Sequence, residues 1–437
     1  MGLREYIDHL EERGELLQIG EPISRHLEMC GVLKNLEPRP VLFENVLESD
    51  FRVAGTLFPS KAVFADYFGI QVAEIIPFLS RAIEERKPCQ VVSEAPCQEV
   101  VVAEPNLDEI PILRHLESDG GNYITSGVFV AGHPEYGQNL DFHRCMQFSP
   151  TEMAVRVVRG RNFDTFLQEL GQVDVAVCVG VPPNVLVAGA TSVDIGIDEL
   201  EIANAMEPLQ VVRAKTVDLL IPAESEFVLE GTVYRDRRHD EGPFVDLTET
   251  HDIIRQEPVL EVKAITHRRD AIWHALLPGG LEHKLLMGMP REPTVFNKVN
   301  EVVKCLDVNV NPGGCSWLHA IVKIEKLHEG DSKKAIEATF AGHSSCKHVF
   351  VVDEDIDIYD PLSVEWAMAT RFQGDVDMVV LERERGSSLD PSAEAGTHLT
   401  TKIGFDLTKP VGETRNFERA EFPEVEMDRF LGEKGLG

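Results

Sequence analysis

The segment Asp240-Glu-Gly-Pro-Phe-Val-Asp246 carries two acidic side chains that could transfer protons. Glu241 and Asp246 lie five residues apart, on either side of a Gly-Pro pair and beside an apolar stretch. Two carboxyl groups in unlike surroundings can supply one proton donor and one charged partner. Acidic turns are also common on protein surfaces, so a solvated turn is the alternative for this segment taken alone.

A second segment, Asn139-Leu-Asp-Phe-His-Arg144, places an amide, an imidazole and a guanidinium in an otherwise apolar stretch. A buried arginine without a partner is costly, so Arg144 is predicted to be paired or functional. An exposed strand of alternating polarity is the alternative. Because side chains alternate along a strand, Asn139 and Arg144 can share one site only if a bulge or a strand end separates them.

Three arginines occur within Arg156-Val-Val-Arg-Gly-Arg161, in a chain that is otherwise strongly acidic. The planar fork of arginine binds phosphate through two hydrogen bonds. This segment therefore indicates a phosphate site, with a solvated basic loop as the alternative.

Acidic residues also open a predicted helix at Asp198-Glu-Leu-Glu201. Such residues suit a helix N-terminus electrostatically, without any function. A hard divalent cation would nevertheless use such a carboxylate, together with an amide carbonyl and phosphate oxygens.

Together the four segments resemble the UbiD family of prenylated-FMN-dependent decarboxylases, and the resemblance covers nearly the whole chain. The family's paired Asn and Arg match Asn139 and Arg144, its metal-binding Glu matches Glu199, and its EGPxxD/E segment matches Glu241 to Asp246. Further matching stretches are Gly313–Lys323, Val349–Asp355 and Lys402–Thr408. The cofactor contacts implied by the resemblance are Phe142, His143, Arg144, Arg156, Val157, Val158, Arg161 and Asn162.

The resemblance implies a division of labour among these residues. Arg144, Glu241 and Asp246 would be catalytic: Arg144 would pair with Glu241 and with the substrate carboxylate, and Asp246 would return a proton to carbon. Mn²⁺ would connect Asn139 and Glu199 to the flavin phosphate, with K⁺ nearby. The prenylated FMN, made by a flavin prenyltransferase, would act as the electron sink.

One position departs from the family pattern. The family usually has a histidine as a further metal ligand just after the arginine-rich strand, whereas this chain reads Gly160-Arg-Asn-Phe163. Either the carbonyl of Asn162 or a water molecule would complete the metal site.

Three stretches resemble the archaeal branch of the family, which converts trans-anhydromevalonate 5-phosphate to isopentenyl phosphate: Tyr123–Gly127, Leu277–Pro290 and Gly386–Pro391. His283 and Lys284 lie in the second stretch, in what reads as a flexible Gly-rich loop, and could bind the substrate phosphate. A solvated loop lysine is the alternative. An aromatic or heteroaromatic carboxylate (hydroxybenzoate, furan or pyrrole type) is the second candidate substrate. An FMN oxidoreductase and a non-catalytic metal- or phosphate-binding scaffold are the alternatives from other classes.

The elements that must position these residues indicate an α/β protein. Its 437 residues are more than a single hydrophobic core usually holds, so several domains are expected. We expect a small α/β domain over residues 1–105, a split β-barrel over 106–300 and a C-terminal α/β oligomerisation domain with a tail over 301–437. The barrel region reads as strands with one short helix, Asp198–Met206, including a hairpin formed by Tyr123–Ala131 and Gln138–Phe148. The last region alternates strands and helices, which predicts a parallel sheet.

Composition narrows the possible partners. A net charge of −32, from 74 acidic and 42 basic residues, argues against nucleic acid. The sequence has neither an apolar run long enough for a membrane helix nor a signal-peptide pattern, and its eight cysteines form no CxxC pair. We therefore expect a cytoplasmic enzyme whose substrate is a small-molecule carboxylic acid. The resemblance implies a homo-oligomer, either a dimer or a hexamer.

Overall fold

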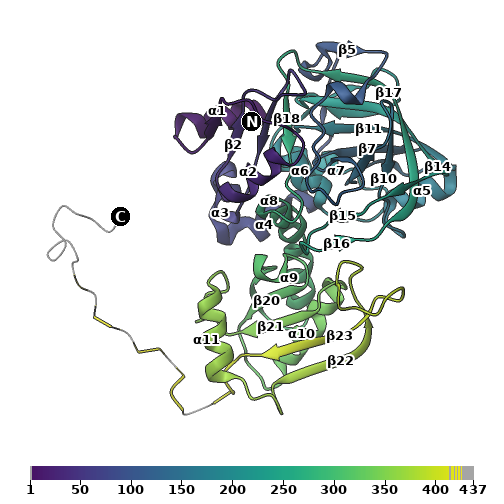
Figure 1. The fold of residues 1–437 in the computed structure, drawn as a ribbon. Helices are drawn as coiled ribbons and strands as arrows, with labels where there is room; N and C mark the ends of the chain where they lie inside the picture. The colour runs from purple at the N-terminus through teal and green to yellow at the C-terminus, as the bar shows by residue number, and fades with distance from the viewer. Residues whose placement is uncertain (1, 413–414, 418, 421, 424, 426–437) are drawn as a thin grey trace.

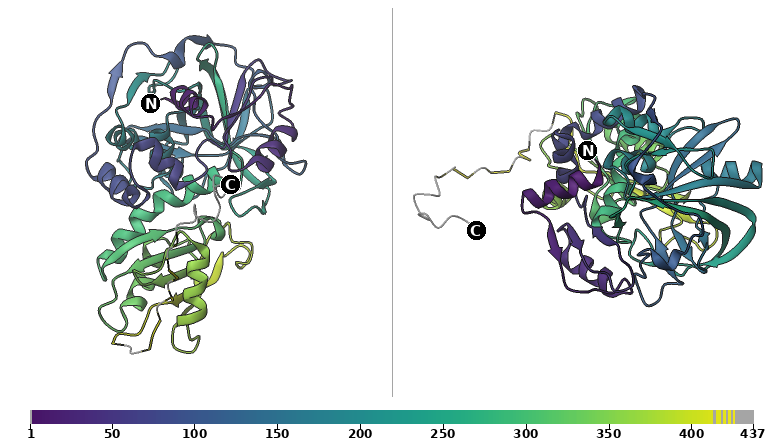
Figure 2. Two further views of the ribbon diagram at one scale, coloured as in Figure 1. Left: turned by 90° about the vertical axis from the view of Figure 1, so that its left-hand side faces the viewer. Right: turned by 90° about the horizontal axis from the view of Figure 1, so that it is seen from above.

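The computed structural model describes residues 2–412, 415–417, 419–420, 422–423 and 425. Figure 1 shows two lobes, one built from the N-terminal and central parts of the chain and one from the C-terminal part. Helices α8 (Leu281–Gly288) and α9 (Glu292–Asn300) lie where the lobes meet, and a second direction of view shows the same junction (Figure 2). The C-terminal tail predicted after Thr408 lies largely outside the described residues.

The N-terminal part packs helices around a small sheet of order β1-β2-β3-β18. Its first helix buries Leu3, Tyr6, Ile7 and Leu10, as their spacing predicts. The elements of this part are α1 (Leu3–Glu12), β1 (Leu17–Ile19), α2 (Glu28–Leu36), β2 (Val41–Phe43), β3 (Arg52–Gly55), α3 (Lys61–Phe68) and α4 (Ile75–Glu84), with β18 (Ile272–Ala275) added from later in the chain.

The central part is dominated by a curled antiparallel sheet of order β6-β9-β10-β17-β14-β11-β7-β8, with β5 added beside β17. Its strands are β5 (Val100–Val102), β6 (Asn122–Ile124), β7 (Val128–His133), β8 (Gly137–Phe142), β9 (Cys145–Gln147), β10 (Glu152–Val155), β11 (Gln172–Val179), β14 (Phe227–Glu241) and β17 (Arg255–His267). Smaller sheets contain β4 (Gln90–Val92), β12 (Gln210–Arg213) and β13 (Leu220–Pro222), and β15 (Phe244–Val245) with β16 (His251–Asp252). The mixed α/β class and the barrel-like sheet predicted from sequence are confirmed.

The prediction of one short helix in the central part is wrong. Helix α7 (Glu199–Met206) is present, but α5 (Asn162–Leu170) and α6 (Pro183–Ala190) precede it. Helix α6 is buried over seven of its eight residues, so its sequence shows no amphipathic period. The two long strands predicted for the hairpin are also each broken in two, giving β6 and β7, then β8 and β9.

The C-terminal lobe contains a sheet of order β19-β20-β21-β23-β22. Its elements are β19 (Cys305–Asn309), β20 (His319–Ile324), α10 (Asp331–Gly342), β21 (His348–Val352), α11 (Pro361–Arg371), β22 (Met378–Arg385) and β23 (Leu399–Asp406). The predicted purely parallel sheet is wrong at both edges. Strands β20, β21 and β23 are parallel, but β19 and β22 are antiparallel to their neighbours. Short 3-10 helices are η1 (Val72–Glu74), η2 (Pro96–Gln98), η3 (Leu107–Glu109), η4 (Met289–Arg291) and η5 (Pro312–Gly314).

Within the described residues, no single helix is long and apolar enough to cross a membrane. One bent pair, Lys61–Phe68 with Val72–Glu84, meets the length and composition criteria only when the two helices are taken together.

Candidate active site

A cavity of about 360 Å³ lies between the rim of the central sheet and the C-terminal lobe. It collects most of the residues predicted from sequence. Those lining it are Asn139, Phe142, His143, Arg144, Arg156, Val158, Arg161, Asn162, Glu199, Asp246 and His283. Val157, Glu241 and Lys284 do not line it: the first two are buried behind the wall, and Lys284 is paired with Glu249 elsewhere.

A break between strands lets Asn139 and Arg144 face the same space. Strand β8 ends at Phe142 and β9 begins at Cys145, so the alternation of side chains is interrupted between the two residues. Both line the cavity. A strand end therefore lets Asn139 and Arg144 share one site, although strict alternation along a strand would place them on opposite faces.

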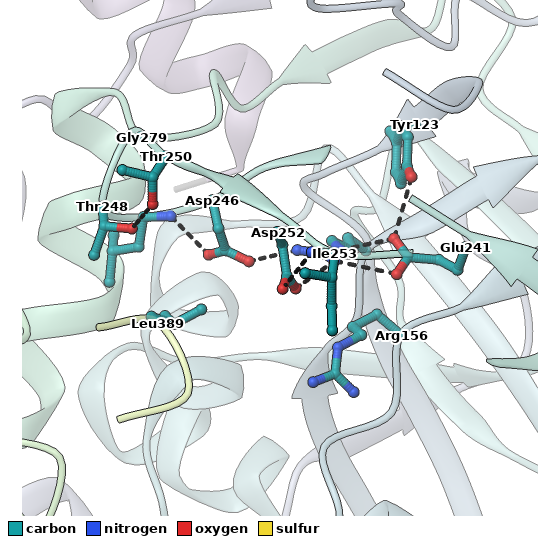
Figure 3. Close-up of polar contacts among 12 residues, drawn as sticks. Tyr123, Arg156, Glu241, Asp246, Thr248, Thr250, Asp252, Ile253, Gly279 and Leu389 are labelled. Atoms are coloured by element: carbon teal, nitrogen blue, oxygen red, sulfur yellow. Dashed lines mark hydrogen bonds and ion pairs between the residues drawn. The ribbon is translucent and has the colours of Figure 1, made fainter. Parts of the chain in front are cut away.

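Arg144 is bound by three carboxylates. Its guanidinium donates to Glu241 at 2.9 and 3.1 Å, to Asp252 at 2.9 Å, and also to Asp246. Figure 3 shows the carboxylates of Glu241, Asp252 and Asp246 in one row, with Tyr123 at the Glu241 end. Burial alone would lower the pKa of Arg144, but these carboxylates, Glu241 foremost, raise it above its ordinary value. Arg144 is thus a permanent cation in the cavity wall.

Aromatic side chains fix this cluster from behind. The Tyr123 hydroxyl donates to Glu241 at 3.2 Å, and its ring packs against Phe244, tilted by 33° and with centroids 4.0 Å apart. The Phe244 ring in turn lies 5.1 Å from the Arg144 guanidinium carbon. Glu241 is fully buried, so Arg144 and Tyr123 replace the water that its charge would otherwise require.

Asp252 and Tyr123 were not singled out as site residues from sequence. Asp252 reaches Arg144 because β15 pairs with β16, which places Phe244 opposite Asp252. Its second partner is Arg255, at 2.5 Å. A short hairpin across residues 244–252 was the only sequence signal that could have found Asp252.

Asn139 and Glu199 form a candidate cation site in the same cavity. Glu199 is 2% exposed and accepts one hydrogen bond, from the Leu140 amide at 2.7 Å. Burial, and to a smaller extent the charges of Asp141 and Asp198, raise the pKa of Glu199 well above its ordinary value. The Asn139 Nδ2 is buried without an acceptor. The carboxylate of Glu199 and the side-chain carbonyl oxygen of Asn139 are nevertheless the types of oxygen ligand that a hard divalent cation binds.

The described residues contain no group of three or more His, Cys, Asp and Glu side chains that could hold a metal ion. Asn162, predicted as a third ligand, lines the same cavity at the start of α5 and donates to the Val193 carbonyl at 3.4 Å. The protein therefore offers amide and carboxylate oxygens for part of a coordination shell.

His283 and Lys284 lie in helix α8, so their predicted placement in a flexible loop is wrong. The Nδ1 of His283 accepts from the Gly279 amide at 3.0 Å, which leaves Nε2 as the protonated nitrogen. Burial lowers the pKa of His283, so its ring is neutral. Lys284 binds Glu249 at 2.6 Å, and only His283 faces the cavity.

A larger groove of about 910 Å³ adjoins the cavity. The two share Arg156, Val158 and Ser388 in their linings. The groove also contains four further arginines, contributed by both lobes: Arg159, Arg238, Arg255 and Arg385. In a chain with a net charge of −32, this is a local concentration of positive charge.

Comparison with known proteins finds matches over nearly the whole chain. Models of the 3-octaprenyl-4-hydroxybenzoate carboxy-lyase family match its N-terminal domain at residues 7–83, its Rift-related domain at 90–281 and its C-terminal domain at 284–407. A relative from Methanosarcina mazei, named anhydromevalonate phosphate decarboxylase, is 42% identical over 97% of this chain and 100% of its own. The chain belongs to the UbiD family. It is therefore a carboxy-lyase, as its motifs predicted.

Solved structures agree with membership of the UbiD family. The UbiD-class enzyme HmfF from Pelotomaculum thermopropionicum, in complex with FMN, has a TM-score of 0.95 and 34% identity, covering 98% of this chain and 100% of that one. An evolved dimeric form of HmfF in complex with prFMN has a TM-score of 0.91 and 33% identity, with the same coverage. The site described above thus lies in a UbiD fold.

Proposed function

We propose that this UbiD-family enzyme decarboxylates trans-anhydromevalonate 5-phosphate to isopentenyl phosphate and CO₂ without net oxidation. The observation that carries the proposal is the full-length similarity to the Methanosarcina mazei relative, whose name states this kind of substrate. The cavity supports it, because Arg144 can bind a carboxylate and Asp246 lies on the same guanidinium to supply a proton.

Prenylated FMN is the cofactor in this proposal, because the similar HmfF structures contain FMN and prFMN. Phe142, His143, Arg156, Val158, Arg161 and Asn162 line the cavity and would hold the flavin, with Val157 behind them. Asn139 and Glu199, with Asn162, would hold Mn²⁺ against its phosphate, and K⁺ would bind nearby. When bound, the prenylated flavin supplies an electron sink for the pair released when CO₂ leaves.

The chain's own residues would divide the remaining work. Arg144 would orient the substrate carboxylate next to the flavin, while fully buried Glu241 keeps the guanidinium charged and fixed. Asp246 is ion-paired with Arg144 in this structure. To act as the acid, Asp246 must take up a proton and release Arg144, after which it can protonate the substrate carbon.

The test uses enzyme co-expressed with a flavin prenyltransferase. We expect CO₂ release from the phosphorylated acid, none from the Glu241→Gln variant, and a cofactor of the mass and absorbance of prenylated FMN. Turnover of a furan, pyrrole or hydroxybenzoate carboxylate, with no turnover of the phosphorylated acid, would show that the proposed substrate is wrong. The enzyme would still be a decarboxylase of the UbiD type. Full activity with ordinary FMN and an electron donor would favour an oxidoreductase instead.

The metal is tested on the purified enzyme by elemental analysis. Glu199→Ala should lose Mn²⁺ and retain flavin less well, whereas neutralising Glu201, a half-buried residue on the same helix that does not line the cavity, should change neither. Stoichiometric Mn²⁺ in Glu199→Ala would place the metal elsewhere. The proposal also includes a cytoplasmic location and a dimer or hexamer, the latter measurable by light scattering.

A further inference from the structure

Three arginines in the interior of the described chain have polar partners, whereas one arginine at the cavity has none. Arg144 binds three carboxylates, Arg371 binds Asp353 and Asp355 at 2.9 and 2.6 Å, and Arg25 donates to backbone carbonyls. Arg291 makes no hydrogen bond or ion pair within the part of the chain that the structure describes, and its Nε is buried without an acceptor. Arg291 as a whole is half-buried, but a guanidinium nitrogen shielded from water without an acceptor is destabilising, so a ligand is the simplest reason for it.

Arg291 is held in place on the cavity wall. It ends η4 at the junction of the lobes, and its guanidinium carbon lies 5.3 Å from the centre of the Trp317 ring. Trp317 is fixed in turn, because its Nε1 donates to Ser387 at 3.1 Å and its carbonyl accepts from His343 Nε2 at 2.8 Å. This aromatic platform orients the guanidinium without neutralising it.

A second cation lies nearby. Arg161 also lines the cavity, and its side chain donates to the Ser192 hydroxyl at 3.5 Å. Burial, and then the charge of Arg161, lower the pKa of Arg291 to about 10, which leaves it protonated at neutral pH. Two guanidiniums that repel each other in a cavity form a site for a multiply charged anion.

We infer that Arg291, assisted by Arg161, binds a phosphate monoester dianion in this cavity. The inference rests on the proposed function, in which both the substrate and the flavin carry such a group. It assigns the phosphate to the junction of the lobes, not to His283 and Lys284 as the sequence suggested. Arginine suits the role because its fork can donate two parallel hydrogen bonds to phosphate oxygens.

The test compares Arg291→Met and Arg291→Lys with Arg86→Met, an exposed arginine at the end of α4 that lies outside the cavity. Methionine preserves the packing on Trp317, so Arg291→Met should fold with an unchanged or higher thermal midpoint. In one arm, holoenzyme turns over the phosphorylated acid and its dephosphorylated counterpart. In the other, full-length protein made without the prenyltransferase binds FMN or riboflavin.

If the substrate phosphate occupies the site, Arg291→Met raises KM for the phosphorylated acid at least tenfold, but not KM for the dephosphorylated one. If the flavin phosphate occupies it, the dissociation constant of FMN rises at least tenfold while that of riboflavin is unchanged. The KM or dissociation constant that rises in Arg291→Met should take an intermediate value in Arg291→Lys. Equal values for Arg291→Met and Arg86→Met in both arms would overturn the inference and leave Arg291 a structural residue.

A third measurement separates this inference from the proposed function. Inorganic phosphate should raise the thermal midpoint of wild-type protein and of Arg86→Met, but not that of Arg291→Met. If wild type fails to decarboxylate the phosphorylated acid, the proposed function is wrong, and this measurement with the FMN arm still decides the site. Equal phosphate-induced shifts in all variants, with FMN binding unchanged, would overturn it.

Discussion

At the scale of single residues, the unusual feature is one guanidinium shared by three carboxylates. Arg144 neutralises only one of the charges on Glu241, Asp246 and Asp252, so the cluster is negative before any substrate arrives. A substrate carboxylate would add a fourth acid group. Of the three carboxylates, Asp246 is the most accessible, with 19% of its side chain exposed.

Glu241→Gln should lower kcat at least 100-fold, because Arg144 would lose its fixed bidentate partner. The free energy of unfolding should fall by about 1–3 kcal/mol, the cost of a weakened buried hydrogen-bonded pair. CO₂ release and urea unfolding measure the two effects. The matched control is Asp240→Asn, at the neighbouring exposed carboxylate, which should behave as wild type. Near-normal turnover of Glu241→Gln would remove Glu241 from the chemistry.

Asp252 is predicted to act as a positioning residue. It holds Arg144 at 2.9 Å and Arg255 at 2.5 Å, so Asp252→Asn should let both guanidiniums shift. We expect kcat/KM to fall about tenfold, with partial rescue by Asp252→Glu and a changed pH profile. An unchanged pH profile with an equal loss in both variants would indicate a packing defect instead.

How much of the site could be predicted depended on distance along the chain. Arg144, Glu241 and Glu199 stood in recognisable short motifs, and the structure brings their segments to one cavity. Asp252 and Arg291 stood in none. Asp252 reaches the site through a two-residue strand pair, and Arg291 through the junction of two lobes, and neither contact leaves a periodic signal in sequence.

At the scale of elements, periodic segments were predicted well and fully buried ones were not. The spacing of apolar residues predicts helix α1, whereas the mostly buried helix α6 was missed. The direction of β22 was predicted wrongly, because β22 pairs antiparallel with β23 across the connection at residues 386–398 instead of extending the parallel strands. The domain boundaries at 105 and 300 stay predictions.

The segment that carries Glu241 and Asp246 is positioned by a close backbone approach. A Cβ on Gly120 would lie 2.2 Å from the Gly242 carbonyl oxygen, and the Gly120 amide donates to Pro243 O at 2.9 Å. Gly120→Ala must therefore displace the segment, and we expect kcat to fall at least tenfold. Gly31→Ala, in α2 with open space around it, is the control and should be neutral or slightly stabilising. Wild-type kcat in Gly120→Ala would show that the segment tolerates displacement.

At the scale of the whole molecule, the cavity depends on how the two lobes meet. His343 ends α10 and donates to the carbonyl of Trp317, whose ring lines the cavity. Burial lowers the pKa of His343 to about 4, so the folded protein keeps this ring neutral at pH values where the unfolded chain binds a proton.

Protonation of His343 in the unfolded chain lowers the stability of the folded protein at acidic pH. Above pH 7 both states are neutral at His343 and its titration contributes nothing. As the pH falls below about 6.5, the unfolded state gains the proton first and stability decreases, by about 1–2 kcal/mol at pH 5. His343→Gln keeps a donor for Trp317 and should lose less stability than wild type between pH 7.5 and 5 in urea titrations. An equal loss in both proteins would contradict the assignment.

The arginine groove beside the cavity sets the direction in which salt changes the rate of encounter. The net charge of −32 repels an anionic substrate at long range, whereas Arg159, Arg238 and Arg385 attract it at the entrance, and none of the three is ion-paired among the described residues. Screening by salt weakens both fields. If the groove governs diffusional capture, kcat/KM falls as NaCl rises from about 20 to 300 mM; if the overall charge governs it, kcat/KM rises.

We expect the fall, because the groove is the last field that the substrate crosses before the cavity. Changing Arg159, Arg238 and Arg385 to Gln should reverse the slope, since only repulsion would then be screened. Changing Arg39, Arg86 and Arg269, exposed arginines outside the groove, removes the same net charge and should leave the slope as in wild type. Identical slopes in both triple variants would mean that capture ignores the groove. An acidic protein would thus take in an anion through a basic groove, and the salt of its surroundings would set how far the electric field of that groove reaches.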